Sequence, residues 1–148
     1  MSFVVKKIVI DTSVLIAVCI YPDRVPADIF KQTLLRYQLV ASTATKNEIE
    51  TVLKRKKFDA WRTLDSRMAW LNEYFQNIAE YVPLQHFTDS IDPKDNMFLD
   101  IAVASNASAI VCSDPHLLNL HPFHADGAKI DILNLRDFKA LYLPESAH

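Results

Sequence analysis

The chain has 148 residues, which is the size of one domain, and half of them are hydrophobic, which is enough for one sizeable core. A formal net charge of −2 excludes a broad basic face, and a single glycine excludes a glycine-rich phosphate-binding loop. The two cysteines, Cys19 and Cys112, lie in apolar runs, so we expect buried free thiols and a reducing compartment.

The N-terminal segment carries no pattern of export or membrane insertion. Lys6 and Lys7 interrupt the apolar start after only three residues, Phe3–Val5, so no signal peptide is expected. The next apolar run, residues 8–20, is too short to span a bilayer and contains Asp11. We therefore expect a soluble, cytoplasmic protein without membrane association.

Short apolar runs alternate with helical patterns along the chain. Strands are predicted at Ile8–Ile10, Leu39–Ala41, Tyr81–Leu84, Ala109–Cys112 and Ile130–Leu133. Helices are predicted at Val14–Ile20, Ala27–Arg36, Thr45–Leu53, Asp59–Ala79, Asp95–Ser105, Pro115–Leu120 and Leu135–Leu141. Strands separated by helices imply an α/β domain, over residues 1–143, with a parallel sheet covered on both faces. The tail, Pro144–His148, is expected to fray.

Asp11 and Asp114 share one setting, because each ends a short buried strand and precedes a helix. Burying a lone carboxylate is costly, so each is expected at the carboxyl end of its strand, at the edge where open α/β sheets bind ligands. The alternative is that each only caps the following helix. Pro115 favours this alternative for Asp114, because proline suits the first helical position.

Glu48 and Asp95 are expected in the first turns of their helices. Residues 45–48, Thr-Lys-Asn-Glu, match a capping box, so Glu48 could simply bond back to the Thr45 amide. Asp95 lies three residues after Asp92, a predicted cap, and an acid there favours the helix dipole in any protein.

Taken together, two acids at strand ends and two in first helical turns would meet at one edge of a parallel sheet. Like charges at ~4 Å repel by roughly 4 kcal/mol per pair at an effective dielectric near 20. No arginine is adjacent in sequence to any of the four. A hard divalent cation suits ligands that offer only oxygen, so Mg²⁺ or Mn²⁺ is expected. Such a centre hydrolyses phosphodiesters, because the metal activates a bound water and neutralises the phosphate.

At these residues the sequence resembles the PIN-domain family, and in particular VapC-like toxins of toxin–antitoxin pairs, over nearly its whole length. The matching segments are residues 9–13 (VIDTS), 47–53 (NEIETVL), 92–99 (DPKDNMFL) with Ala102, and 111–118 (VCSDPHLL). No single segment is specific, but the four occur in the family's order and spacing. The sequence departs at residues 105–108, Ser-Asn-Ala-Ser, where family members often have glycine before the fourth strand.

The resemblance implies a three-layer fold with a parallel sheet of about five strands and helices on both faces. It implies Mg²⁺- or Mn²⁺-dependent cleavage of RNA, a homodimer and a small antitoxin partner. The metal ligands and catalytic acids would be Asp11, Glu48, Asp95 and Asp114, and the catalytic hydroxyls Thr12 or Ser13 and Ser113 would order water or an acid. Asp92 and Asp100 receive no role.

Three other signals each allow two interpretations. The cationic run Lys54–Lys57 either grips RNA phosphates or complements the negative end of its helix. Trp70 and Tyr74 lie off the main apolar stripe of their helix and belong either to its core or to an antitoxin groove or dimer face. The segment His121–His124 has a spacing that zinc ligands use, but without nearby cysteines it favours a surface loop.

Two classes of function follow. The first is a metal-dependent endoribonuclease that acts as a toxin. The second is a catalytically silent PIN-like regulator that binds RNA or protein. A phospho-acceptor domain is disfavoured, because it needs an acidic pair after the first strand and a lysine after the last. A phosphatase with a DxD motif is disfavoured because Ser13 takes the place of the second acid.

Overall fold

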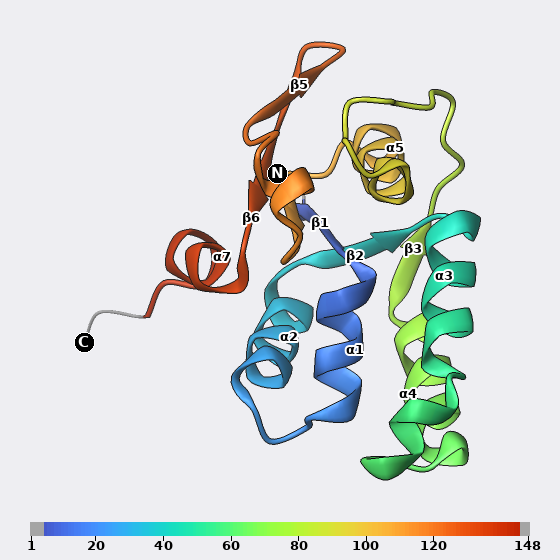
Figure 1. Cartoon of the computed structure of the whole chain (residues 1–148). Helices are drawn as coiled ribbons and strands as arrows, with labels where there is room; N and C mark the ends of the chain where they lie inside the picture. Colours follow the sequence, from blue (N-terminus) through green and yellow to red (C-terminus); the bar gives the residue numbers. More distant parts are fainter. Residues whose placement is uncertain (1–4, 146–148) are drawn as a thin grey trace.

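The computed structural model describes residues 5–145. Residues 3 and 4 of the apolar start and residues 146–148 of the predicted tail lie outside the described residues. A six-stranded sheet forms the centre, in the order β3-β2-β1-β4-β6-β5 (Figure 1). The strands are β1 (Lys7–Ile10), β2 (Gln38–Ala41), β3 (Ile78–Glu80), β4 (Ala109–Val111), β5 (Phe123–Ala125) and β6 (Ala128–Leu133). The α-helices are α1 (Thr12–Ile20), α2 (Val25–Arg36), α3 (Thr43–Leu53), α4 (Leu64–Gln76), α5 (Asn96–Ser105), α6 (Pro115–Leu118) and α7 (Leu135–Tyr142), with 3₁₀ turns η1 (Lys56–Ala60) and η2 (Pro93–Asp95).

The order of the strands creates a switch point beside β1. The chain adds β2 and β3 on one side of β1, then returns to add β4 and β6 on the other side, all parallel. Loops after β1 and β4 therefore diverge at the carboxyl edge of the sheet. Open α/β sheets bind ligands at such a crevice, and Asp11 and Asp114 lie in these two loops.

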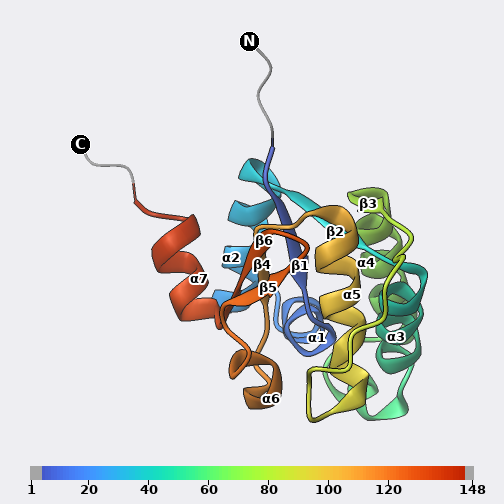
Figure 2. The same cartoon turned by 90° about the horizontal axis from the view of Figure 1, so that it is seen from above.

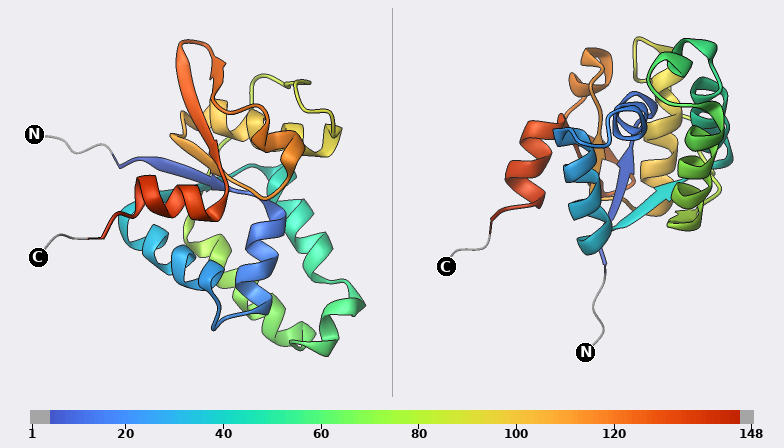
Figure 3. Two further views of the ribbon diagram at one scale, coloured as in Figure 1. Left: turned by 60° about the vertical axis from the view of Figure 1, so that its left-hand side comes forward. Right: turned by 90° about the horizontal axis from the view of Figure 1, so that it is seen from below.

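Alternating side chains of the central strands build two cores. Ile8 and Ile10 of β1 pack into the core beneath α1, α2, α4 and α7, whereas Val9 packs into the core beneath α5 and α6. This alternation follows from the two-residue period of a strand. Helix α5 lies against β1 and β2 (Figure 2), and α7 lies beside α2 (Figure 3). The predicted three-layer α/β fold, with helices on both faces of the sheet, is confirmed.

The prediction for residues 59–84 was wrong in two places. The expected helix Asp59–Ala79 is shorter, because Thr63 caps the start of α4 and Asn77 ends it. The expected strand Tyr81–Leu84 lies instead at Ile78–Glu80, where it pairs with Leu39–Ala41 of β2. The Tyr81 amide makes the last bond to β2, at 3.0 Å from the Ala41 carbonyl oxygen, before Pro83 removes a donor.

Strand β5 was not predicted from the sequence. It pairs antiparallel with β6 through a two-residue turn, Asp126–Gly127, in which both residues have positive φ, 52° and 78°. Asp-Gly is a preferred pair for this kind of hairpin turn, so the signal was present in the sequence. The sheet therefore has five parallel strands, as expected, and one antiparallel edge strand. No helix within residues 5–145 combines the length and the apolar character needed to cross a bilayer.

Candidate metal centre

Asp11 and Asp114 lie next to each other because β1 and β4 pair up to their ends. The Asp11 amide donates to the Val111 carbonyl oxygen at 2.9 Å, so the strand pairing continues to the first carboxylate. Each aspartate also caps its helix: Asp11 Oδ1 accepts from the Val14 amide at 2.9 Å, and Asp114 Oδ1 from the His116 amide at 2.8 Å. Capping uses one oxygen of each side chain, so it does not exclude a second role for either residue.

Glu48 and Asp95 come from α3 and from the turn before α5. The prediction that Glu48 lies in the first turn of its helix was wrong, because α3 begins at Thr43 and Glu48 lies in the second turn. The alternative capping box at residues 45–48 does not form either, since Ser42 and Thr45 cap α3, and Glu48 is half-buried. Asp95 ends η2, whose cap is Asp92, as the sequence predicts.

The four predicted acids line one open depression of about 400 Å³ at the switch point. Thr12, Ser13 and Ser113 line it as well. Asp92, which received no role in the sequence reading, offers a carboxylate oxygen within 4.8 Å of one from Asp95 and one from Asp114. Its signal was the same Asp-Pro-Lys-Asp segment that identified Asp95. Asp100 lies outside this depression and accepts a hydrogen bond from the Phe87 amide at 2.7 Å.

Hydroxyl groups connect the two loops that carry Asp11 and Asp114. Ser13 Oγ donates to Asp11, at 3.0 Å from Oδ1 and 3.1 Å from Oδ2. The same Oγ lies 2.8 Å from Ser113 Oγ, across a sequence separation of 100 residues. These contacts fix the orientation of the Asp11 carboxylate. Thr12 is buried in the first turn of α1.

Asp11, Asp95 and Asp114 have shifted pKa values. Burial raises the pKa of Asp11 to about 6, against the lowering effect of its bonds to Val14 and Ser13. Burial, followed by the neighbouring Asp114, raises the pKa of Asp95 to about 7. The pKa of Asp114 is lowered by the neighbouring carboxyl group of Asp95 and by the hydrogen bond from the His116 amide. Near neutral pH the depression thus holds carboxylates that repel one another and that are partly kept neutral by protons.

The residues of the depression fit a divalent cation. Asp95 is 9 % exposed, yet its Oδ2 atom is buried without a hydrogen-bond partner. Among residues 5–145, no lysine or arginine forms an ion pair with any of the acids that line the depression. A buried carboxylate oxygen without a partner is costly unless a cation or a proton occupies the space beside it. Because the available donors are all oxygens, the site suits a hard ion such as Mg²⁺ or Mn²⁺.

Comparison with known proteins agrees with this architecture. The PIN domain family matches residues 7–116, which is more than half of the chain. No curated protein sequence matches the chain. Among solved structures, the fold is similar to VapBC2 from Rickettsia felis bound to a DNA fragment from its promoter, with a TM-score of 0.58, 10 % identity, and coverage of 86 % of this chain and 99 % of that chain. It is also similar to PAE2754 from Pyrobaculum aerophilum, with a TM-score of 0.58, 12 % identity, and coverage of 95 % and 91 %. Identities this low establish a shared fold, whereas the family match establishes descent, and this chain belongs to the PIN-domain family.

Proposed function

We propose that the protein is a metal-dependent endoribonuclease that hydrolyses phosphodiester bonds with Mg²⁺ or Mn²⁺. The observation that carries the proposal is the buried Asp95 oxygen without a partner, set among further carboxylates at the switch point of the sheet. A site with this many acids and no paired cation repels a polyanion unless a metal neutralises it.

Each residue of the depression has a role in this proposal. Asp11, Glu48, Asp95 and Asp114 would hold the ion, and Asp92 lies close enough to join them. When bound, the ion supplies a Lewis acid that activates water and neutralises charge on the phosphate. Ser13 keeps Asp11 in position, and Ser113 and Thr12 offer hydroxyls at the rim of the same space.

The test uses carboxylate-to-amide variants. Asp11→Asn keeps the helix cap, because asparagine caps as well as aspartate does, but removes the charge. We expect it to abolish both Mn²⁺ binding and cleavage of RNA, while the exposed Asp65→Asn in α4 changes neither. Undiminished cleavage by Asp11→Asn would reject the assignment. Absence of cleavage by the wild-type protein with every metal and RNA tried, together with tight partner binding, would favour the silent regulator.

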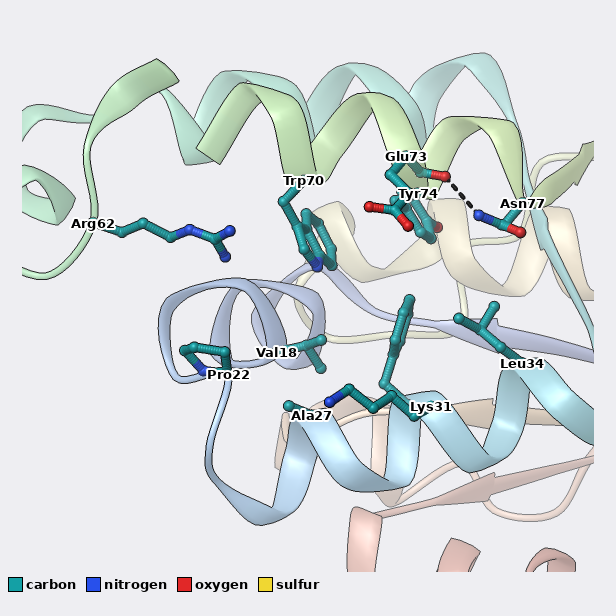
Figure 4. Close-up of a pocket in the computed structure, with 11 residues that line it drawn as sticks. Val18, Pro22, Ala27, Lys31, Leu34, Arg62, Trp70, Glu73, Tyr74 and Asn77 are labelled. Carbon is teal, nitrogen blue, oxygen red and sulfur yellow. Dashed lines mark hydrogen bonds between the residues drawn. The ribbon is translucent and has the colours of Figure 1, made fainter. Parts of the chain in front are cut away.

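We further propose that the protein is the toxin of a toxin–antitoxin pair, acts in the cytoplasm as a homodimer and binds a small antitoxin. A cleft of about 240 Å³ between α1, α2 and α4 suits an apolar segment of such a partner (Figure 4). Phe30 and Trp70 both line it and are in contact, with ring centroids 5.9 Å apart, and Trp70 stacks on Tyr74 at 5.6 Å. Of the two possibilities left open by the sequence, Tyr74 is largely core, whereas Trp70 is half-buried beside the cleft.

Trp70 also provides the readout for the partner. The other tryptophan, Trp61, is 58 % exposed, so Trp61→Phe leaves Trp70 as the single emitter at little structural cost. We expect the product of the neighbouring gene to shift the Trp70 emission of this variant on binding. An unchanged emission alongside binding measured by calorimetry places the partner elsewhere. Analytical ultracentrifugation of the toxin alone tests the dimer.

A further inference from the structure

A second depression lies at the same edge of the sheet as the acidic one. It has a volume of about 290 Å³, and its lining includes Thr43, Tyr81, Val82, His86, Met97 and Asp100. Tyr81 and Val82 follow the carboxyl end of β3, and Thr43 follows the carboxyl end of β2. Helices α3 and α5, which are in contact, supply residues to both depressions: Thr43 and Met97 here, Glu48 and Phe98 in the acidic one. The two depressions are therefore neighbours.

A histidine is held at the second depression by a buried carboxylate. Asp100 is 9 % exposed, and its Oδ2 lies 3.1 Å from Nδ1 of His86, whose side chain is 83 % exposed. A carboxylate at this distance accepts the proton of Nδ1, so Nε2 carries the free lone pair of the ring and accepts a hydrogen bond from a ligand. A pair of this type orients an imidazole toward solvent at fixed geometry.

The other walls are apolar or carry backbone amides. Tyr81, Val82 and Met97 offer an aromatic and two aliphatic surfaces, and Val82 is 78 % exposed. Thr43 and Ala44, in the first turn of α3, also line the depression. An apolar wall combined with a few polar groups is typical of a pocket for a nucleotide.

The carboxylate of Glu80, which is bonded to Thr43, does not oppose the binding of a nucleotide in this depression. Glu80 accepts a hydrogen bond from Thr43 Oγ1 at 3.0 Å, and Lys46 Nζ lies 3.2 Å from its Oε2. The lysine therefore offsets the charge that Glu80 would otherwise present to an incoming phosphate.

We propose that this second depression is a nucleotide subsite, in which a base of the single-stranded substrate lies against Tyr81 and Met97 and a ribose hydroxyl of the same nucleotide donates to His86 Nε2. The inference rests on the proposed nuclease function, because it assigns to that function a place for the nucleotide next to the scissile bond. His86 binds the substrate in this proposal and Asp100 positions His86; neither residue lines the acidic depression.

A purely structural role for the pair makes a different prediction. Asp100 also binds the Phe87 amide at 2.7 Å, and Asn96 Oδ1 accepts from the Ser90 amide at 2.9 Å, so the segment after β3 is tied to α5 without help from His86. If anchoring were the only role, removal of the His86 ring would leave nucleic-acid binding unchanged, because both backbone bonds remain.

The experiment measures binding and cleavage separately. In an Asp11→Asn background, the affinity for a fluorescein-labelled oligouridine is determined by fluorescence anisotropy, without cleavage of the probe. We expect His86→Ala to weaken binding by about fivefold, the value of one neutral hydrogen bond. The control is His124→Ala, an exposed histidine on β5, which leaves the affinity unchanged. With Asp11 intact, the loss from His86→Ala falls in KM rather than in kcat.

A second pair of variants tests whether RNA binds in the depression itself, independently of His86. Val82→Asp puts a negative charge on the wall of the depression, and Leu84→Asp puts one on the same loop outside the lining; Leu84 is 92 % exposed. We expect weaker RNA binding from Val82→Asp than from Leu84→Asp. Equal affinities for His86→Ala and His124→Ala overturn the subsite even when the protein cleaves RNA. Binding that depends on His86 in a protein that cleaves nothing supports the subsite and rejects the nuclease.

Discussion

Arg67 of α4 donates through Nε to the carbonyl oxygen of Leu53, the last residue of α3, at 2.7 Å. The arginine side chain is completely buried and also binds the carbonyls of Arg55 and Arg62 and the carboxylate of Asp59. It thus satisfies acceptors at the end of the helix that carries Glu48, and it determines how α3 meets α4.

We predict that Arg67→Met lowers the free energy of unfolding by about 3 kcal/mol, because several buried carbonyl groups lose their donor at once. Chemical denaturation with circular dichroism measures the effect. Asp59→Asn is the control: its side chain is 58 % exposed, so loss of its ion pair costs less than about 1 kcal/mol. Equal destabilisation by the two variants would contradict the assignment of the effect to the carbonyls.

The raised pKa values predict how the metal-free protein responds to pH. The folded state of Asp11 titrates near pH 6 and that of Asp95 near pH 7, both above the ordinary 3.8, so the folded protein binds more protons than the unfolded one within this window. Stability in EDTA is therefore highest below about pH 4 as far as these groups contribute, and it falls as the pH rises toward 7. We expect Mn²⁺ bound at pH 8 to replace the protons and to restore the lost stability. Thermal unfolding from pH 5 to pH 8, with and without Mn²⁺, tests this, and a profile that rises with pH in EDTA would refute it.

Removal of one charge should stabilise the metal-free protein. Asp11→Asn keeps the bond to the Val14 amide and removes a carboxylate whose ionised form is disfavoured by burial. The rise of the pKa of Asp11 from 3.8 to about 6 corresponds to a free energy of roughly 3 kcal/mol, so we predict a gain of up to about 3 kcal/mol at pH 8 in EDTA. The same variant should gain nothing from Mn²⁺. A variant that is less stable than the wild-type protein in EDTA would show that the acidic cluster is not under strain.

The hydrogen bond from Ser13 to Asp11 should affect the site more than the fold. Because Ser13 is exposed and contacts only side chains of the two loops, Ser13→Ala should change stability by less than about 1 kcal/mol. Loss of a donor to the carboxylate raises the pKa of Asp11 further, and we expect about tenfold weaker Mn²⁺ binding at pH 7. Titration calorimetry checks this, with Ser90→Ala as the control, since the buried Ser90 hydroxyl has no partner within residues 5–145.

Local patterns in the sequence predict the parts of the fold that depend on local chemistry. The β-branched run before Asp11 and the Asp-Pro starts at residues 92 and 114 each contain enough information to locate a strand or a helix. Ile78 was misassigned because it continues a helical spacing that the partner strand β2 overrides. Arg67 could not be predicted as buried, since its acceptors lie in other elements and no pattern marks them.

The grouping of acids around Asp95 depends on topology, and only part of it was predictable. Parallel strands imply a shared edge, which is why Asp11 and Asp114 were expected together. Side-chain directions are not implied, so nothing in the sequence ranks Asp92 against Glu48, and the structure places Asp92 close to Asp95 and Asp114. The contact between Asp100 and His86 could not be predicted, because Asp100 lies in α5 and His86 lies in a loop that has no characteristic sequence pattern.

The bridge from Ser13 to Ser113 joins two loops that are made at different times during synthesis of the chain. The two loops that carry Asp11 and Asp114 are separated by about two thirds of the chain. The loop with Asp114 follows β4, which is made after β2 and β3 and pairs with β1. A growing chain still attached to the ribosome therefore lacks the depression until Asp114 has left the exit tunnel. Whatever this edge of the sheet binds, it can bind only after β4 and Asp114 have emerged and joined β1.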